Sequence, residues 1–506
     1  MSLLERARAA GTAARRHAGW VALALGALQS LSFAPAAIAP LGVGCLAGLW
    51  WLWRDAPPAR AARLGFLFTA GLFLAGTYWL YTSIHVFGNA PLAIAFLLMA
   101  GLAAIMGGYA ALLGALMAWV APGARLAKLL ALYPAGWVLM EWFRGWFLTG
   151  FPWLALGYSG LDTPLAGYAP LVGVYGVSLI AALVAGALVV LLERRGRLRV
   201  VLVGALVLAL ACGGLLERVE WTRPSGAALT VALLQGSIPQ DLKWQQDNRG
   251  HTLEVYAGLE RQALGARLIV WPEAALPALY HEVVPYLTPL YQEARAHGSD
   301  LAIGLLRYDF EAKVYRNGLV ALGRDEQWYY KRHLVPYGEF FPVPEFVREW
   351  MRLNDLAYAD LAPGAPDQPP LDAAGQKLGA TICYEDAYSA EQLAVLSSAT
   401  LLVNVSNDAW FGDSSAPHQH LQIARFRALE AGRWMMRATN NGISALIDPT
   451  GRVVARGEQF RALVLRGQVV PYTGLTPYAR TGTWPVLAAC VALLIAARPW
   501  RRRARA

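Results

Sequence analysis

The chain carries little charge for its length. Of its 506 residues only 15% are charged and 56% are hydrophobic, whereas soluble domains carry about 25% charged residues. This composition excludes an ordinary soluble protein and predicts a membrane protein, alone or joined to a soluble domain. The net charge of +10 does not indicate nucleic-acid binding, because the basic residues stand in short clusters between apolar runs, as membrane topology requires.

Cysteine is also scarce. There are four, and three of them, Cys45, Cys212 and Cys490, lie within long apolar runs. Cys383 alone stands in a polar segment, where an apolar stretch ends and charged residues begin. No disulfide partner is expected for Cys383 unless a membrane cysteine could reach it. This thiol is therefore either an inert packing residue or a nucleophile.

Long apolar runs fill most of the first 216 residues. A membrane span needs about 20 predominantly apolar residues, and seven candidates precede residue 217, with an eighth near the C-terminus. They lie near 19–36, 38–53, 64–84, 91–120, 127–143, 166–192, 198–216 and 484–497. The basic start before the first run resembles a signal peptide, but with six further spans behind it we expect a retained helix.

The loops between these runs alternate in charge. Arginine clusters occupy every second loop and the C-terminal tail, whereas the loops near 34–40, 85–90 and 145–165 hold no Lys or Arg. Under the positive-inside rule both termini are cytoplasmic. The predicted domains are then a seven-span transmembrane bundle at 1–216, a soluble domain on the outer side at 217–483, and a transmembrane helix with a basic cytoplasmic tail at 484–506.

Segment 217–483 has a different composition, in which short β-rich runs alternate with helical patterns. Such alternation is typical of an α/β domain with a largely buried sheet, and the segment's length suits one domain. The predicted strands lie near 229–235, 267–271, 301–306, 378–383, 401–405 and 443–447, and the predicted helices near 246–264, 282–297, 387–397 and 417–439.

Three residues whose side chains could take part in catalysis follow β-rich runs: Glu273, Lys331 and Cys383. In α/β sheets, ligands gather outside the carboxyl ends of the strands. A carboxylate there can act as a general base. A lysine can lower a thiol pKa and hold an oxyanion, with the backbone N–H of Tyr384 as a second donor. Each residue also has a structural alternative: a packing thiol, a helix-capping carboxylate or a solvated lysine.

Together the local sequences resemble a known family. Trp-Pro-Glu at 271–273, Tyr-Tyr-Lys-Arg-His-Leu-Val-Pro-Tyr-Gly-Glu at 329–339 and Cys-Tyr-Glu at 383–385 resemble the nitrilase superfamily, whose catalytic Glu–Lys–Cys set occupies three such strand ends. With spans before and after this domain, the chain resembles the membrane-embedded branch, the apolipoprotein N-acyltransferases. The segments 235–240, 243–244, 404–412 and 437–442 agree as well. The resemblance implies a multi-domain membrane protein, with a nitrilase-like αββα sandwich beside a bundle of about eight spans.

The resemblance also implies a reaction. Glu273 would deprotonate Cys383, and the thiolate would attack the sn-1 ester of a phospholipid, typically phosphatidylethanolamine, while Lys331 and the Tyr384 N–H hold the oxyanion. The thioester on Cys383 would then acylate the α-amine of a diacylglyceryl-cysteine apolipoprotein, with ping-pong kinetics. The setting would be the bacterial inner membrane, with the catalytic domain periplasmic. The resemblance implies no metal, organic cofactor or nucleic acid, and we expect a monomer.

Supporting roles follow from the same resemblance. Glu339 and Glu385 would orient Lys331 or the base, and Trp244 would line the acyl or lipoprotein pocket; turn carboxylates and plain packing are the alternatives. Segment 340–350 has an apolar face that could dip into the membrane interface, or pack as an ordinary helix. For the pair at 418 and 420, His-Gln-His, no third metal ligand is apparent, and we expect a solvated helix start.

Two rival functions stay open. A membrane-tethered nitrilase-type amidase would use the same three residues, with water as the second nucleophile. A transporter or scaffold with an outer α/β domain would place charged or broken segments mid-membrane. The predicted spans hold few such residues, mainly Glu141 and Arg144 near a helix end, which disfavours the transporter.

Overall fold

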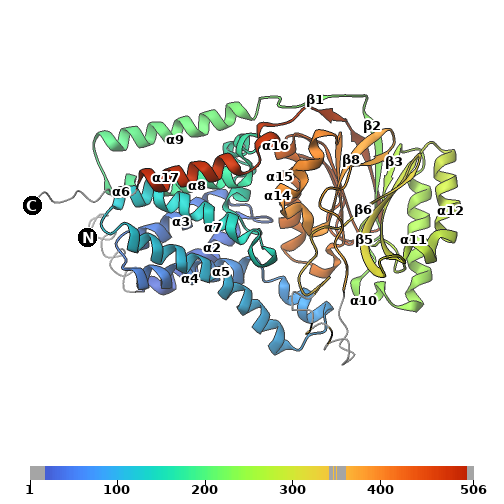
Figure 1. The fold of residues 1–506 in the computed structure, drawn as a ribbon, viewed down its shortest axis with the longest axis horizontal. Coiled ribbons are helices and arrows are strands. Elements are labelled where there is room, and N and C mark those ends of the chain that lie inside the picture. The colour runs from blue at the N-terminus through green and yellow to red at the C-terminus, as the bar shows by residue number, and fades with distance from the viewer. Residues whose placement is uncertain (1–16, 341–345, 347–348, 350–359, 498–506) are drawn as a thin grey trace, which may run out of the picture. The chain divides into compact units, whose positions relative to one another are not determined.

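The computed structural model describes residues 17–340, 346, 349 and 360–497, and it contains two compact units (Figure 1). The helical unit comprises Met1–Val219 and Thr481–Ala506, and the α/β unit comprises Glu220–Arg480. Most of segment 340–350, for which we expected an interfacial role, lies outside the described residues.

The helical unit contains fewer long apolar helices than the expected eight spans. Among the described residues, four helices are long and apolar enough to cross a membrane, and three shorter ones are apolar as well. The run expected over 127–143 is divided into a π-turn and a short helix, so a count of eight stays a prediction. The helices are α2 (Ala18–Gln29), α3 (Ala39–Trp53), α4 (Pro58–Gly76), α5 (Leu92–Val120), α7 (Tyr133–Arg144), α8 (Ala169–Glu193), α9 (Arg197–Leu216) and α17 (Trp484–Ala496).

Small residues let these helices approach closely. A Cβ built on Gly26 of α2 would lie 1.8 Å from the carbonyl oxygen of Phe68 in α4, so a larger residue at this position would push the two helices apart. Close backbone approach at glycine is typical of helix packing in membranes, where no hydrophobic effect drives apolar helices together.

Two charged residues, Glu141 and Arg144, have hydrogen-bond partners inside the helical unit. Glu141 accepts hydrogen bonds from the Trp137 indole (3.0 Å), the Leu156 N–H (2.9 Å) and the Ser178 hydroxyl (2.7 Å). Arg144 donates to the carbonyls of Phe151 and Trp153 at 2.6 and 2.9 Å. Both side chains are buried. Satisfied contacts of this kind stabilise the local fold and give no support to a transport pathway.

The α/β unit is built on two six-stranded sheets. In each, three adjacent strands run parallel: β2, β3 and β4 in the first sheet, β8, β9 and β10 in the second. The order of the first sheet is β13 (Leu463–Val469), β2 (Leu229–Gln235), β3 (Leu268–Val270), β4 (Asp300–Asp309), β5 (Val314–Leu322) and β6 (Glu326–Tyr330). The order of the second is β12 (Val453–Arg456), β11 (Ala445–Ile447), β10 (Met435–Thr439), β9 (Leu401–Ser406), β8 (Gln376–Ile382) and β7 (Leu371–Ala373).

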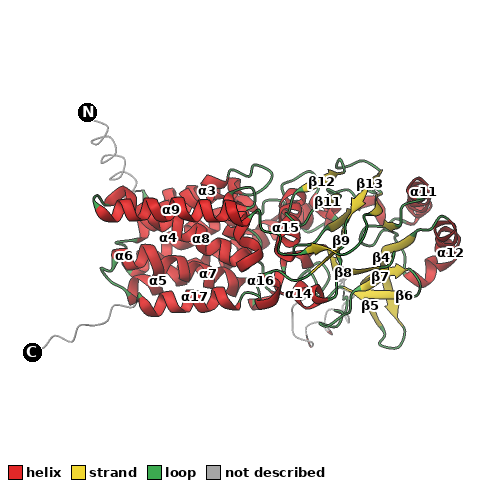
Figure 2. Cartoon of the chain, turned by 90° about the horizontal axis from the view of Figure 1, so that it is seen from above, coloured by secondary structure: helices red, strands yellow, loops and turns green. Residues whose placement is uncertain are grey.

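The two sheets pack face to face, and helices cover their outer faces (Figure 2). The inner core includes Leu233 and Val270 of the first sheet with Leu378 and Val403 of the second, all fully buried. Helices α11 (Gln246–Ala263) and α12 (Tyr280–Ala296) cover the first sheet, and α15 (Ala416–Ala431) covers the second. The layers are therefore α–β–β–α, and the predicted α/β architecture is confirmed.

The shorter elements of this unit connect the layers. They are α10 (Gln240–Lys243), the 3-10 turn η7 (Cys383–Ala387), α14 (Ser389–Leu393), α16 (Pro477–Thr481), and the two-stranded pair β1 (Arg223–Pro224) with β14 (Tyr472–Thr473).

Strands β5, β7, β12 and β13 were not among the predicted strands, and one predicted helix is wrong in its C-terminal part. The helix predicted over 417–439 ends at Ala431, and residues 435–439 form strand β10 instead. Gly432 adopts the left-handed conformation (φ 60°, ψ 42°) that terminates many helices. The Met, Arg and Ala residues of β10 have high intrinsic helix propensity, so pairing with β9 and β11 overrides the local preference.

Candidate active site

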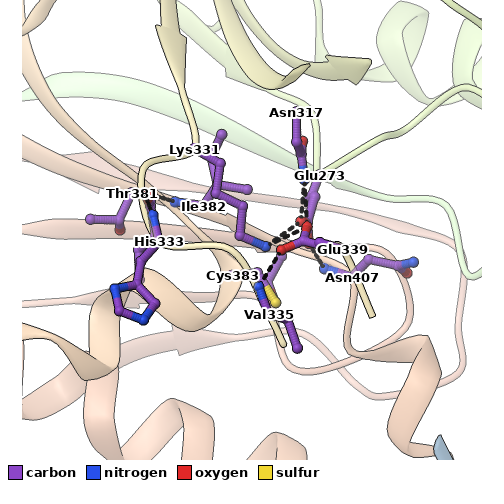
Figure 3. A network of polar contacts seen from close by, with 12 residues as sticks. Glu273, Asn317, Lys331, His333, Val335, Glu339, Thr381, Ile382, Cys383 and Asn407 are labelled. Carbon is purple, nitrogen blue, oxygen red and sulfur yellow. Dashed lines mark hydrogen bonds and ion pairs between the residues drawn. The ribbon is translucent and has the colours of Figure 1, made fainter. Parts of the chain in front are cut away.

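The three residues predicted from strand ends come together between the two sheets (Figure 3). Glu273 lies just beyond β3 and Lys331 directly follows β6, both in the first sheet; Cys383 directly follows β8 of the second. All three are buried, with relative exposures of 6%, 1% and 9%. The site is thus assembled from both halves of the sandwich.

A buried ammonium group lies between two carboxylates. Lys331 Nζ donates to Glu339 Oε1 at 2.8 Å and to Glu273 Oε1 at 3.3 Å. Burial lowers the pKa of Lys331, but the charges of both carboxylates outweigh it and hold this pKa well above its usual value. Lys331 is therefore a permanent cation and hydrogen-bond donor at neutral pH, and it cannot serve as a base.

Two asparagines that the sequence did not single out fix the carboxylate of Glu273. Asn317, on β5, donates its side-chain amide to Glu273 Oε1 at 2.7 Å and reaches Glu339 Oε1 at 3.3 Å. The backbone N–H of Asn407, just after β9, donates to Glu273 Oε2 at 2.8 Å. Asn317 directly follows Arg316 in the polar first half of β5, so nothing in the local sequence marked its role.

Cys383 occupies a strained turn. Its φ of 53° lies in the left-handed region, which costs a residue with a side chain about 1–3 kcal/mol. Figure 3 shows its sulfur on the side of the Lys331 ammonium and the Glu273 carboxylate. Burial and the charge of Glu273 raise the pKa of the thiol, and Lys331 opposes them. The resting thiol is therefore protonated and needs a base to become a nucleophile.

Glu385 connects the turn at Cys383 with the loop that follows Lys331. Its Oε2 accepts from the N–H of Ile382, just before Cys383, at 2.7 Å, and its Oε1 accepts from the N–H of Arg332, just after Lys331, at 2.5 Å. Burial raises the pKa of Glu385 to about 7, against the pull of these N–H groups. Such a bridge is the geometry that an orienting role requires.

The other two candidate residues lie differently. Tyr384 is half-buried, and its ring contacts those of Tyr388 and His333 with centroids 5.1 and 5.9 Å apart. Trp244, directly after α10, is 50% exposed, so plain packing does not describe it. Within the described residues, no hydrogen bond joins Trp244 to the polar network of the site.

Lys243 is a second buried lysine near the site. It is 1% exposed, and its Nζ has no hydrogen-bond partner among the described residues. Burial lowers its pKa to about 8, while the charge of Glu273 acts in the opposite direction. Sequence reasoning gave Lys243 no role, because nothing in the local pattern distinguishes a buried lysine from a solvated one.

The prediction of a solvated helix start at His418 and His420 is wrong for the second histidine. His420 is 1% exposed, and its two ring nitrogens lie 2.9–3.0 Å from carboxylate oxygens of Asp408 and Asp386. The reason is that α15 turns this position inward, against the second sheet.

Comparison with known proteins agrees with this architecture. Family models described as "Apolipoprotein N-acyltransferase N-terminal domain" and "Carbon-nitrogen hydrolase" match residues 25–187 and 230–478. A protein of Methylococcus capsulatus named "Apolipoprotein N-acyltransferase" is 44% identical over 493 residues, which cover 96% of each chain. The chain belongs to the apolipoprotein N-acyltransferase family.

Other members of the apolipoprotein N-acyltransferase family are similar over the same extent. The Azotobacter vinelandii protein of that name is also 44% identical, and the alignment covers 96% of each chain. The solved structure of Saccharomyces cerevisiae Nit3, of the nitrilase superfamily, aligns with 56% of this chain and 100% of its own at 16% identity and a TM-score of 0.37. The close relatives and the apolar helices make the chain a bacterial membrane protein.

Proposed function

We propose that this family member transfers an acyl chain from the sn-1 position of a phospholipid to the α-amine of N-terminal diacylglyceryl-cysteine in apolipoproteins. One observation carries the proposal: the buried thiol of Cys383, in a strained turn, shares a polar site with the hydrogen-bonded ammonium of Lys331 and the carboxylate of Glu273. The names of the relatives favour acyl transfer over the amidase alternative.

In the first half-reaction, Glu273 takes the proton of the Cys383 thiol, and the thiolate attacks the ester carbonyl carbon. The Lys331 ammonium and the Tyr384 N–H stabilise the oxyanion of the tetrahedral intermediate. The ester C–O bond breaks, and Glu273 returns the proton to the lysophospholipid oxygen. A thioester remains on Cys383.

In the second half-reaction, the neutral α-amine of the apolipoprotein attacks the thioester carbonyl. Glu273 takes a proton from the attacking nitrogen, the C–S bond breaks, and the proton passes to the departing thiolate. The product is an amide, and Cys383 returns to the thiol form that its raised pKa favours. Glu339 and Glu385 would hold Lys331 and Cys383 in the orientation that the reaction needs. Trp244 would contact one of the two lipid substrates.

The membrane setting completes the proposal. Alternating basic loops support cytoplasmic termini and a periplasmic α/β unit, with about eight spans in a monomer. Both substrates are lipids, and phosphatidylethanolamine is the expected donor. No metal or organic cofactor enters either half-reaction as written.

Labelling of Cys383 tests the function. Purified protein is incubated with a phospholipid that carries a labelled sn-1 chain, and mass spectrometry locates the label. We expect label on Cys383 without an acceptor, and its transfer to a diacylated lipopeptide when one is added. Unlabelled wild-type protein, or continued transfer by Cys383→Ser, would refute the proposal. Steady release of free fatty acid without an amine would instead indicate a hydrolase, with water as the second nucleophile.

A further inference from the structure

A buried cluster of four charges lies behind Cys383, and the mechanism above does not use it. Asp386, Asp408, His420 and Arg437 are each at most 1% exposed. Arg437 reaches Asp386 at 3.3 Å and Asp408 at 3.0 Å, and His420 reaches the same two carboxylates at 3.0 and 2.9 Å. We call these four residues the charge cluster.

The charge cluster is neutral only if His420 is doubly protonated. Nε2 of His420 faces Asp386 Oδ1 and Nδ1 faces Asp408 Oδ1, so both ring nitrogens must donate. Burial and Arg437 lower the pKa of His420, but the two aspartates outweigh them and raise it to about 9. Two cations and two anions therefore balance at neutral pH, as buried charges require.

The cluster reaches Cys383 at two points. His420 Nε2 lies 3.1 Å from the Cys383 carbonyl oxygen, and the side-chain amide of Asn404, itself an acceptor from Arg437, lies 3.4 Å from the same oxygen. The Ser406 hydroxyl donates to Asp408 at 2.8 Å and acts to lower the pKa of the Cys383 thiol, whereas the charge of Asp408 raises it. A cluster that served only to fill the core would need neither contact.

We infer that His420 is a positioning residue: together with Asp386, Asp408 and Arg437 it holds the carbonyl of Cys383 in its left-handed turn and balances the charge behind the thiol. The inference rests on the proposed role of Cys383 as nucleophile. Through Asp408 the charge cluster adds a further electrostatic influence on the thiol to those of Glu273 and Lys331.

Two single substitutions and their combination test the charge balance. His420→Gln keeps an amide that can donate to the Cys383 carbonyl but leaves the cluster at −1. Asp408→Asn keeps an acceptor for Ser406 but leaves it at +1. The double variant is neutral again. Glu273 and Lys331, the other charged groups that act on the thiol, are the same in all of these proteins.

The readout is the rate at which iodoacetamide alkylates Cys383 in the full-length protein at pH 8, followed by mass spectrometry of its peptide. A nearby charge shifts a pKa by about 1–3 units, and each unit changes the alkylation rate about 3-fold, because nucleophilicity partly offsets thiolate fraction. We expect alkylation at least ~3-fold slower in His420→Gln, at least ~3-fold faster in Asp408→Asn, and close to wild type in the double variant. His418→Gln, two residues away on α15, is the matched control.

Same-sign changes in the two single variants, or no change in either, would overturn the inference, since a purely structural role predicts no opposite signs. Thermal unfolding is measured for each variant. If a single variant is unfolded, the neutral double variant should again show a thermal unfolding transition. A double variant without this transition would also overturn the inference that the charge cluster must be neutral. Alkylation needs no lipid. Absence of acyl transfer in the wild type would therefore refute the proposed function, while the opposite changes in alkylation rate of the two single variants would still be expected.

Discussion

Replacing Glu273 by Gln should separate the reactivity of the thiol from catalysis. Among the charges that act on the Cys383 thiol, that of Glu273 raises the thiol pKa and that of Lys331 opposes it. Removing the charge of Glu273 favours the thiolate. A nearby like charge shifts a pKa by about 1–3 units, so we expect the thiol pKa to fall by about two units, or about 3 kcal/mol.

The lower thiol pKa should make Cys383 more reactive, whereas the acyl-transfer activity is expected to fall. A thiol pKa about two units lower gives roughly 100-fold more thiolate at pH 8, and falling nucleophilicity leaves a net gain of about tenfold in alkylation by iodoacetamide. Acyl transfer should nevertheless fall by about 10²–10⁴, the usual contribution of a general base. The same protein would thus be more reactive toward a small electrophile and nearly inactive toward phospholipid.

The assay measures both quantities on one preparation. Alkylation of Cys383 is followed by mass spectrometry from pH 6 to 10, and transfer by the labelled sn-1 chain. Glu339→Gln is the matched control, because it removes the other carboxylate from Lys331 and leaves the proposed base in place. Slower alkylation in Glu273→Gln would refute the electrostatic reasoning, and undiminished transfer would refute the assignment of the base.

Further predictions concern three other residues. Lys243→Met should stabilise the protein by about 3 kcal/mol at pH 7, because burial disfavours the charged lysine and lowers its folded-state pKa to about 8. This gain in stability, measured by unfolding in detergent, should decrease above pH 8 and vanish near the unfolded pKa of about 10.4. Glu385→Ala leaves backbone N–H groups on both sides of the site unpaired, at about 1–3 kcal/mol each, so both thermal stability and kcat should fall; unchanged kcat would contradict an orienting role. Trp244→Ala should raise KM for one lipid substrate while alkylation of Cys383 stays as in the wild type, and an altered alkylation rate would instead place Trp244 in the nucleophile's surroundings.

Local patterns predicted the α/β unit well, because its strands are short and apolar. The strand expected over 229–235 matches β2, and those expected around 267–271 and 401–405 contain or nearly match β3 and β9. Strand β10 was missed, because its composition favours a helix and only its partners in the sheet make it extended. The number of membrane spans stays a prediction for a related reason: a hydropathy pattern gives the length of an apolar run, not where a proline or a turn interrupts the helix.

The candidate site was predictable only where residues follow strands. Glu273, Lys331 and Cys383 could be proposed together because the carboxyl ends of strands share an edge. The contacts of Asn317 and Asn407 join segments 44 and 134 residues from Glu273, and no local pattern reports such distant pairings. The same holds for His420, whose inward orientation depends on how α15 packs.

The division of the site between two sheets also has a consequence for the newly made chain. The base and the ammonium belong to one sheet and the thiol to the other, while the contacts that align them, such as Glu385 with Arg332 and Asn407 with Glu273, cross from sheet to sheet. Under the proposed mechanism, the thiol has no base within reach until the sheets dock, and it should react only slowly with a membrane lipid before that point. Reactivity toward lipid should therefore appear only with the finished fold.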